Sequence, residues 1–138
     1  MKNYELLEHT ADLGIRVWGK DLKQLFINAA SAMYELIADI SEIKHDTAVD
    51  VELEAQDADE LLRNWLSELL SCFHIKEMLL SEFLIEELNE KKIVSVAKGE
   101  KIDTKRHSLK REIKAVTFHN LKISQENGKF TTEIIFDV

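Results

Sequence analysis

The sequence has very few of the residues that usually mark turns, disulfides and membrane spans. It contains no proline and only four glycines, so most turns must be inferred from other residues. Its single cysteine, Cys72, excludes an internal disulfide framework and is typical of a reducing compartment. No stretch approaches the roughly 20 apolar residues that cross a bilayer, and the first residues lack the apolar segment of a secretory signal. We therefore expect a cytoplasmic protein with no membrane contact.

An excess of basic residues is also missing. The 138 residues carry 26 acidic and 18 basic side chains, which gives a formal net charge of −8. Because tight binding to bare nucleic acid requires a basic surface, we expect any RNA contact to be indirect or weak. The charge suits a basic protein partner or a bound cation, or it simply keeps the domain soluble. The stretch 101–114 is locally basic, which indicates a solvated loop or, alternatively, a phosphate or RNA contact.

Apolar residues are plentiful enough for one core. They make up 45% of the chain, which predicts a single domain over residues 1–138. Two segments carry apolar side chains at helical spacing, and each opens on a capping pattern that starts at Asp21 or Asp57. These patterns predict one helix that ends near residue 39 and another that ends near residue 76.

Alternating apolar side chains predict the strands. The predicted strands cover residues 4–8, 13–18, 48–55, 80–88 and 92–97. Residues 99–110 are polar and are expected to form a loop. Strands interleaved with two helices predict an α+β fold, in which both main helices pack on one face of a largely antiparallel sheet.

The pair Asn127–Gly128 is the strongest turn signal in the chain. Both residues tolerate positive φ, so the pair predicts a hairpin between about 115–126 and 129–137. Counting outwards from a two-residue turn sets Asp137 opposite Phe118. A bulge near His119–Asn120, where the apolar phase changes, would shift this pairing by one residue. The last residues are thus expected inside a paired strand.

Few residues form a pattern that carries chemistry. The sequence has no nucleophile motif, no phosphate-binding loop and no zinc spacing, and Cys72 lies in an apolar stretch typical of a buried thiol. His9 and Asp12 are spaced for half of a catalytic pair or a metal site, or for a capped turn. Asp137 and Val138 would bring carboxylate and main-chain oxygens together, which favours Ca²⁺ or Mg²⁺, unless this end is simply exposed to solvent.

The segment Glu8–Ile15, with the sequence EHTADLGI, resembles the opening signature of the archease family. Further blocks of the chain resemble this family in the same order, and together they cover nearly its full length. They are Leu25–Ala30 with Met33, Leu66–Leu70, Gly99–Lys110, Glu112–Thr117 and Ile135–Val138. The resemblance implies a strand–helix–strand–strand-like module with an elaborated sheet.

The resemblance also implies a function. Archeases are accessory proteins without catalysis of their own, best known for activating the GTP-dependent RNA ligase of tRNA splicing and RNA repair. They promote guanylylation of the ligase histidine and multiple turnover. The family's metal site maps onto Asp12, Asp137 and Val138, with Ca²⁺ the usual ion and Mg²⁺ or Mn²⁺ the alternatives. Lys114 and His9 map onto positions linked to the partner and its activation.

Two other functions remain open from the sequence. The first is a chaperone-like modulator of a tRNA cytosine methyltransferase, a role also attributed to the family. The second is a free-standing metal-dependent phosphoesterase, which oxygen ligands beside a histidine would permit.

Overall fold

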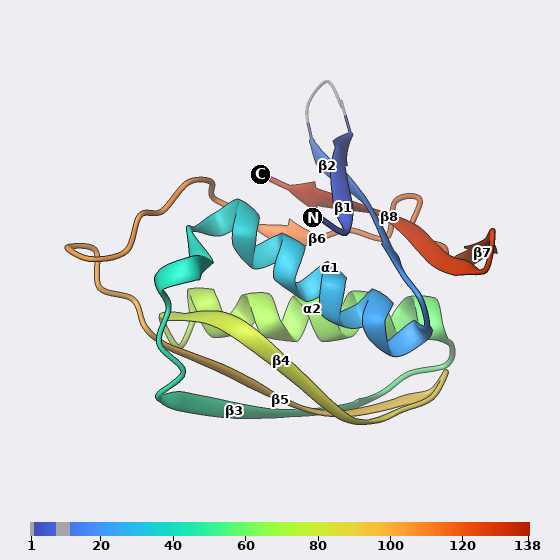
Figure 1. Cartoon of the computed structure of the whole chain (residues 1–138), viewed down its shortest axis with the longest axis horizontal. Helices are drawn as coiled ribbons and strands as arrows, with labels where there is room; N and C mark the ends of the chain where they lie inside the picture. Colours follow the sequence, from blue (N-terminus) through green and yellow to red (C-terminus); the bar gives the residue numbers. More distant parts are fainter. Residues whose placement is uncertain (1, 8–11) are drawn as a thin grey trace.

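The computed structural model describes residues 2–7 and 12–138, and its helices lie between two antiparallel sheets (Figure 1). The first sheet contains β1 (Tyr4–Leu7), β2 (Leu13–Gly19), β6 (Ala115–Val116), β7 (Ser124–Glu126) and β8 (Lys129–Asp137). The second sheet contains β3 (Thr47–Glu54), β4 (Met78–Leu88) and β5 (Lys92–Lys101). The helices are α1 (Leu22–Ile37), α2 (Ala58–His74) and the short 3-10 helix η1 (Ile40–Glu42).

Both main helices begin where their capping patterns predict. The carboxylate of Asp21 accepts a hydrogen bond of 2.8 Å from the amide of Gln24, and that of Asp57 accepts one of 2.9 Å from the amide of Glu60. Each bond satisfies one of the amides that a helix N-terminus leaves without a partner. No helix in the described part of the chain is both long and apolar enough to span a bilayer.

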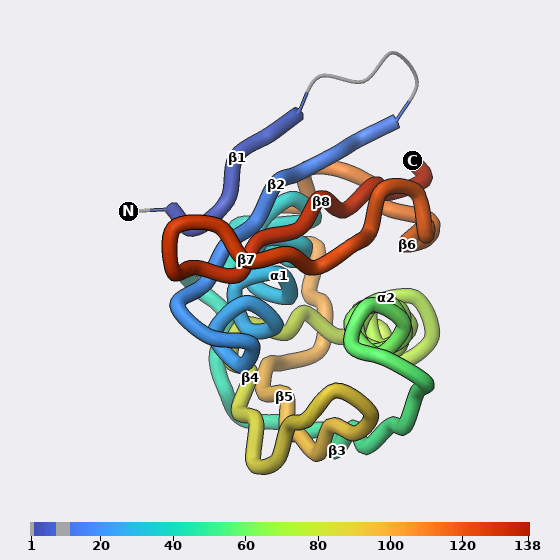
Figure 2. The backbone as a smooth tube through the Cα atoms, turned by 90° about the vertical axis from the view of Figure 1, so that its right-hand side faces the viewer, coloured from blue at the N-terminus to red at the C-terminus, as the bar shows by residue number. Residues whose placement is uncertain are grey.

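The α+β class, the two main helices and the antiparallel pairing are confirmed. The strands divide between two sheets, however, where the sequence predicted one sheet with both helices on a single face. The reason lies in α1, of whose 16 residues ten are buried. A helix buried this widely needs cover on more than one side, and α1 contacts β2 of the first sheet and β4 of the second (Figure 2).

The order of the first sheet is β1-β2-β8-β6, with β7 also paired to β8. The Asn127–Gly128 turn joins β7 to β8 as predicted, with φ of 51° and 78°. Asp137 pairs with Ala115, whereas an uninterrupted ladder would pair it with Phe118. Between the β6–β8 pairing and the β7–β8 pairing, the segment 117–123 therefore has three residues more than an uninterrupted ladder would need. The sequence predicted a bulge of one residue there.

Local hydrogen bonds hold this irregular stretch. The amide and the hydroxyl of Thr117 both donate to the carbonyl oxygen of Ile135, over 3.0 Å and 2.9 Å. The amide of His119 donates to the hydroxyl oxygen of Thr117 over 3.2 Å, and Asn120 adopts a φ of 58°. The end of β8 is thus paired again after the interruption.

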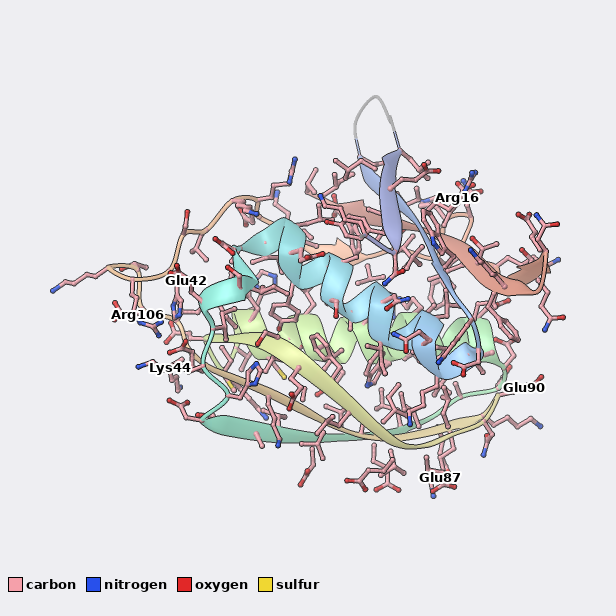
Figure 3. The ribbon with its side chains drawn as sticks, viewed as in Figure 1. Arg16, Glu42, Lys44, Glu87, Glu90 and Arg106 are labelled. Atoms are coloured by element: carbon pink, nitrogen blue, oxygen red, sulfur yellow. The ribbon has the colours of Figure 1, made fainter. Side chains whose placement is uncertain are left out.

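The polar stretch after β5 is anchored to the rest of the molecule. The imidazole of His107 is buried, and its Nδ1 accepts a hydrogen bond of 2.8 Å from the amide of Asp103. The carboxylate of Glu100 binds the guanidinium of Arg106 and accepts a 2.6 Å hydrogen bond from the amide of Lys44. Figure 3 shows Arg106 and Lys44 close together at one end of the molecule. The exposed lysines of this stretch fit the predicted solvated loop, whereas the buried side chains of Glu100 and His107 do not.

Candidate functional site

Two neighbouring strands bring the predicted metal ligands to one end of the first sheet. Leu13 of β2 pairs with Phe136 of β8, and the next residues outward are Asp12 and Asp137. Continuing the register by one residue sets these two acids across from each other. Phe136 is fully buried on the face toward the helices, so alternation puts Asp137 on the outward face, where it is exposed, as Asp12 is.

This position makes the two carboxylates electrostatic neighbours. Residues directly opposite on antiparallel strands have Cβ atoms about 4.5–5.5 Å apart, and like charges there repel each other. Among the described residues, no ion pair involves the carboxylate of Asp12 or of Asp137. A cation held between them would relieve the repulsion.

The donor chemistry fits a hard divalent cation. The carboxylates of Asp12 and Asp137, together with main-chain oxygens of Val138, offer oxygen ligands of the kind that Ca²⁺ and Mg²⁺ prefer. No group of three or more His, Cys, Asp or Glu side chains suited to a metal occurs in the described ranges. Water or further ligands would therefore have to complete the coordination, as is common for both ions.

Lys114 reaches this end of the sheet through its main chain. Its amide donates a hydrogen bond of 2.7 Å to the carbonyl oxygen of Asp137. Lys114 also lines a hollow of about 140 Å³ between α2 and β6, which we call the α2–β6 hollow. Polar residues of α2 line the same hollow: Arg63, Ser67, Ser71 and His74. His9, the remaining predicted residue, lies outside the described residues.

Sequence reasoning missed the polar residues of α2. The guanidinium of Arg63 lies 4.5 Å from the ring centroid of Phe118, and its Nε donates to the carbonyl oxygen of Val116 over 3.2 Å. Nε2 of His74 lies 2.7 Å from the carbonyl oxygen of Ile113, and since a carbonyl only accepts, this nitrogen carries the proton. The signal that could have found them is a polar stripe at helical spacing beside the apolar face of the helix.

The one cysteine takes no part in this site. Cys72 is 2% exposed in α2, and burial raises the pKa of its thiol above the ordinary value. A thiol held in the neutral form is a poor nucleophile. The prediction of a buried structural thiol is confirmed.

Known proteins match this chain along its whole length. Residues 4–138 match the archease protein family (MTH1598/TM1083). Protein archease of Methanopyrus kandleri is 38% identical over 138 residues, which cover 98% of this chain and 99% of that protein. Protein archease of Pyrococcus abyssi is 35% identical over 142 residues, with full coverage of both chains.

Solved structures share the fold. The solution structure of protein 1598 of Methanobacterium thermoautotrophicum matches with a TM-score of 0.85 at 35% identity and covers 100% of both chains. A crystal structure from Thermotoga maritima, described as an archease and possible chaperone, matches with a TM-score of 0.66. It is 21% identical and covers 96% of this chain and 94% of its own, so it supports the fold alone. The sequence profile and the full-length relatives agree, and the chain belongs to the archease family.

Proposed function

We propose that this protein is a non-catalytic activator of a GTP-dependent RNA ligase in tRNA splicing or RNA repair. It promotes guanylylation of the ligase histidine and multiple turnover. Family membership supports this role, because ligase activation is the function that the archease resemblance implies. The observation that carries the proposal is the convergence of Asp12, Asp137 and Lys114 on one end of the first sheet.

The exposure of the site suits a protein that presents it to another enzyme. Asp12, Asp137 and Lys114 are all exposed, and Val138 is 44% exposed. The α2–β6 hollow, which Lys114 lines, has a volume of about 140 Å³ and is smaller than the ~300–1,000 Å³ of typical small-molecule sites. An exposed end of a sheet can dock into a partner's active site, whereas turnover of a bound substrate usually needs a cleft.

The site residues have separate roles in this proposal. The side chains of Asp12 and Asp137 and main-chain oxygens of Val138 hold a divalent cation, for which Ca²⁺ is our first assignment and Mg²⁺ or Mn²⁺ the alternatives. When bound, the ion supplies positive charge for the triphosphate of GTP. Lys114 neutralises a phosphate or pairs with a ligase carboxylate, and His9 contributes to the contact with the ligase. Charge pairing of this kind fixes the register and rate of docking.

A ligase guanylylation assay tests the proposal. The ligase is incubated with GTP and Ca²⁺, Mg²⁺ or Mn²⁺, with and without this protein, and the guanylylated ligase is quantified over time. We expect Asp12→Ala and Asp137→Ala to abolish stimulation while the melting temperature stays near that of the unmodified protein. Asp50→Ala, which removes an exposed acid from β3 in the other sheet, is the matched control. Normal stimulation by both site variants would contradict the proposal.

A chaperone-like role toward a tRNA cytosine methyltransferase is the second candidate. The description of the Thermotoga maritima neighbour as a possible chaperone favours it. This role predicts that the protein keeps a purified methyltransferase soluble on warming, and that Asp137→Ala does so equally well. Loss of protection in Asp137→Ala would instead tie both roles to the acidic site.

A free-standing phosphoesterase has less support. The described ranges contain no cluster of metal-binding side chains of the size that such enzymes use. Hydrolysis of a phosphodiester by the isolated protein, lost on adding a chelator, would favour it over an accessory role.

A further inference from the structure

A surface hollow where β2 meets α1 is lined by one tryptophan and three lysines. We call it the Trp18 hollow; its volume is about 570 Å³, and it is lined among others by Lys2, Trp18, Lys20, Gln24, Asn28 and Lys129. None of the described residues that line it is acidic. In a chain with 26 acids and 18 bases, this is a local reversal of charge. The Trp18 hollow therefore suits an anionic ligand with a flat apolar part.

The position of Trp18 differs from that of the other tryptophan. Trp65 is fully buried in the core, and its indole nitrogen donates to the hydroxyl of Ser95 over 3.0 Å. Trp18 is only half-buried and lies on the outward face of β2, next to its cross-strand partner Thr131. A second hollow of about 210 Å³ also borders Trp18 and shares Lys129 with the first. Trp18 thus borders two hollows, which suits a residue on which a flat ring can stack.

The lysines of the Trp18 hollow are available to an anion. Among the described residues, no ion pair involves the ammonium groups of Lys2, Lys20 or Lys129. Arg16, on the same face, is instead occupied by Glu5 at 3.6 Å and Glu133 at 3.0 Å. Figure 3 shows Arg16 on the side of β2 away from the helices. Lys2, Lys20 and Lys129 therefore bring positive charge to the Trp18 hollow that no described carboxylate neutralises by an ion pair.

Hydrogen bonds fix the wall of the Trp18 hollow. The side-chain Nε2 of Gln24 donates to Oδ1 of Asn28 over 2.8 Å. The side-chain Nδ2 of Asn28 in turn donates to the carbonyl oxygen of Trp18 over 2.8 Å, and Asn28 is 8% exposed. These bonds tie the first turns of α1 to the end of β2. The main chain at Trp18 is thus held in place before any ligand arrives, which lowers the ordering cost of binding.

Acidic groups border the area and limit the expected affinity. Asp21 lies at the N-terminus of α1, where its carboxylate accepts the amide of Gln24. Glu126 lines the second hollow. Together with the net charge of −8, these groups favour a weak interaction that depends strongly on salt.

We propose that the Trp18 hollow binds single-stranded nucleic acid, with one base stacked on Trp18 and neighbouring phosphates on Lys2, Lys20 and Lys129. Stacking on an exposed aromatic ring beside basic side chains is the usual way in which proteins bind single strands without reading their sequence. The second hollow extends the space beyond one nucleotide, which favours a strand over a free mononucleotide. Ligase activation makes RNA the strand to test first, but this binding is independent of that role.

Trp18 and the candidate metal ligand Asp12 lie on the same face of the sheet. Alternation puts Asp12 and Trp18 on the outward side of β2, and the six steps along the chain from one to the other span about 20 Å at ~3.3 Å per residue. A nucleic-acid strand bound at Trp18 can therefore extend toward the end of the sheet that carries Asp12 and Asp137.

Titration of the isolated protein with an RNA octamer at low salt tests the proposal. Intrinsic fluorescence reports on Trp18, because Trp65 is buried, and the anisotropy of a labelled octamer gives the affinity independently. We expect quenching of the emission, a weakening of about tenfold or more for Trp18→Ala, and a smaller effect for Trp18→Phe, which keeps a stacking ring. Melting temperatures of both variants show whether each remains folded.

Matched lysine variants separate the site from general charge. In one variant Lys2, Lys20 and Lys129 are changed to Gln; in its control, the same change is made at three exposed lysines elsewhere, Lys76, Lys105 and Lys110. Both variants have the same net charge. We expect the first to flatten the dependence of log K on log salt by about 0.7 per lysine and the control to leave it nearly unchanged.

Several results would overturn the proposal. Equal weakening in the two lysine variants would show that only overall charge matters. Unchanged affinity in folded Trp18→Ala would show that no base stacks on Trp18. If GMP binds as tightly as the octamer, the ligand of the hollow is a mononucleotide and not a nucleic-acid strand. Similar binding of DNA and RNA octamers would support a site that reads neither sequence nor sugar. A failure in these assays leaves ligase activation untouched, because no ligase is present.

Discussion

The amide of Lys114 donates a hydrogen bond of 2.7 Å to the carbonyl oxygen of Asp137. The bond continues the pairing between β6 and β8, in which Ala115 lies opposite Asp137. Because it joins main-chain atoms, side-chain substitutions at Lys114 and Asp137 leave it in place. The contribution of each side chain to function can thus be measured without separating the two strands.

Calcium should raise the thermal stability of the protein through Asp12 and Asp137. An ion that binds only the folded state adds about 2.7 kcal/mol at 100 times its Kd. We expect Asp12→Asn and Asp137→Asn to lose the calcium-dependent shift in melting temperature. Without calcium, each variant should be at least as stable as the unmodified protein, because one of two repelling charges is gone.

Differential scanning fluorimetry across a calcium titration measures these shifts. Asp50→Asn, in the other sheet, is the control and should respond to calcium as the unmodified protein does. A full calcium shift in both Asp12→Asn and Asp137→Asn would exclude these carboxylates as ligands.

Glu100 should make stability depend on pH. Burial opposes its ionisation, but the Lys44 amide, His107 and Arg106 outweigh this effect and lower the pKa of the carboxyl. Nε2 of His107 lies 3.2 Å from Oε2 of Glu100, without the alignment of a hydrogen bond. A group with a lowered folded-state pKa stabilises at neutral pH, and this contribution is lost as pH falls through the folded-state pKa.

Glu100→Gln should therefore cost about 1–3 kcal/mol at pH 7, since it leaves the partners of the carboxylate unsatisfied. The difference from the unmodified protein should shrink as the pH is lowered below the ordinary carboxyl pKa of about 4.3. Urea unfolding at several pH values measures it. Glu87→Gln, at an exposed position of β4, is the control and should change stability little. A cost for Glu100→Gln that stays constant down to pH 3 would disprove the linkage.

The helix caps should contribute independently. Asp57→Ala removes the bond to the amide of Glu60 and should cost about 1 kcal/mol, and Asp21→Ala should cost a similar amount at α1. Asparagine at either position keeps an oxygen acceptor and should cost much less. Chemical denaturation of the single and double variants tests whether the two costs add, as expected for sites that share no partner.

Cys72 should react with thiol reagents only when the protein opens. Burial keeps it 2% exposed and raises the pKa of its thiol, so accessibility and ionisation both slow the reaction. Labelling with an aromatic disulfide should be slow in buffer and fast in urea. A Cys72→Ala/Ser124→Cys variant, with its thiol at an exposed position of β7, should label quickly under both conditions. Fast labelling of native Cys72 would show that α2 opens locally.

Local signals predicted the local structure well. The aspartate caps and the Asn127–Gly128 turn depend on residues a few positions apart, and each appears at the predicted place. The second sheet could not be predicted in this way, because which strands pair depends on contacts far apart in the sequence. Strand β5 also extends beyond its prediction through Gly99, where the backbone passes so close to Leu79 that a side chain would collide with it.

The candidate site could likewise be predicted only in part. Asp12 and Asp137 were tied together by family resemblance, and the register of β2 and β8 sets them at one end of the sheet. Their role as metal ligands stays a prediction. Arg63 and His74 were missed because their relation to Lys114 arises only when α2 packs beside β6. The burial of His107 was missed because its neighbour Glu100 lies near the end of β5, and the sequence predicted that this strand stops at residue 97.

The three surplus residues between β6 and β7 have a consequence for insertions and deletions. Asp137 is positioned by its pairing with Ala115 and by the β2–β8 ladder, and neither pairing includes residues 118–123. A chain with one residue more or fewer in that segment can keep the same ladder on both sides. Length variation among relatives is therefore tolerable there, whereas a single insertion between Phe130 and Phe136 would move Asp137 to the buried face.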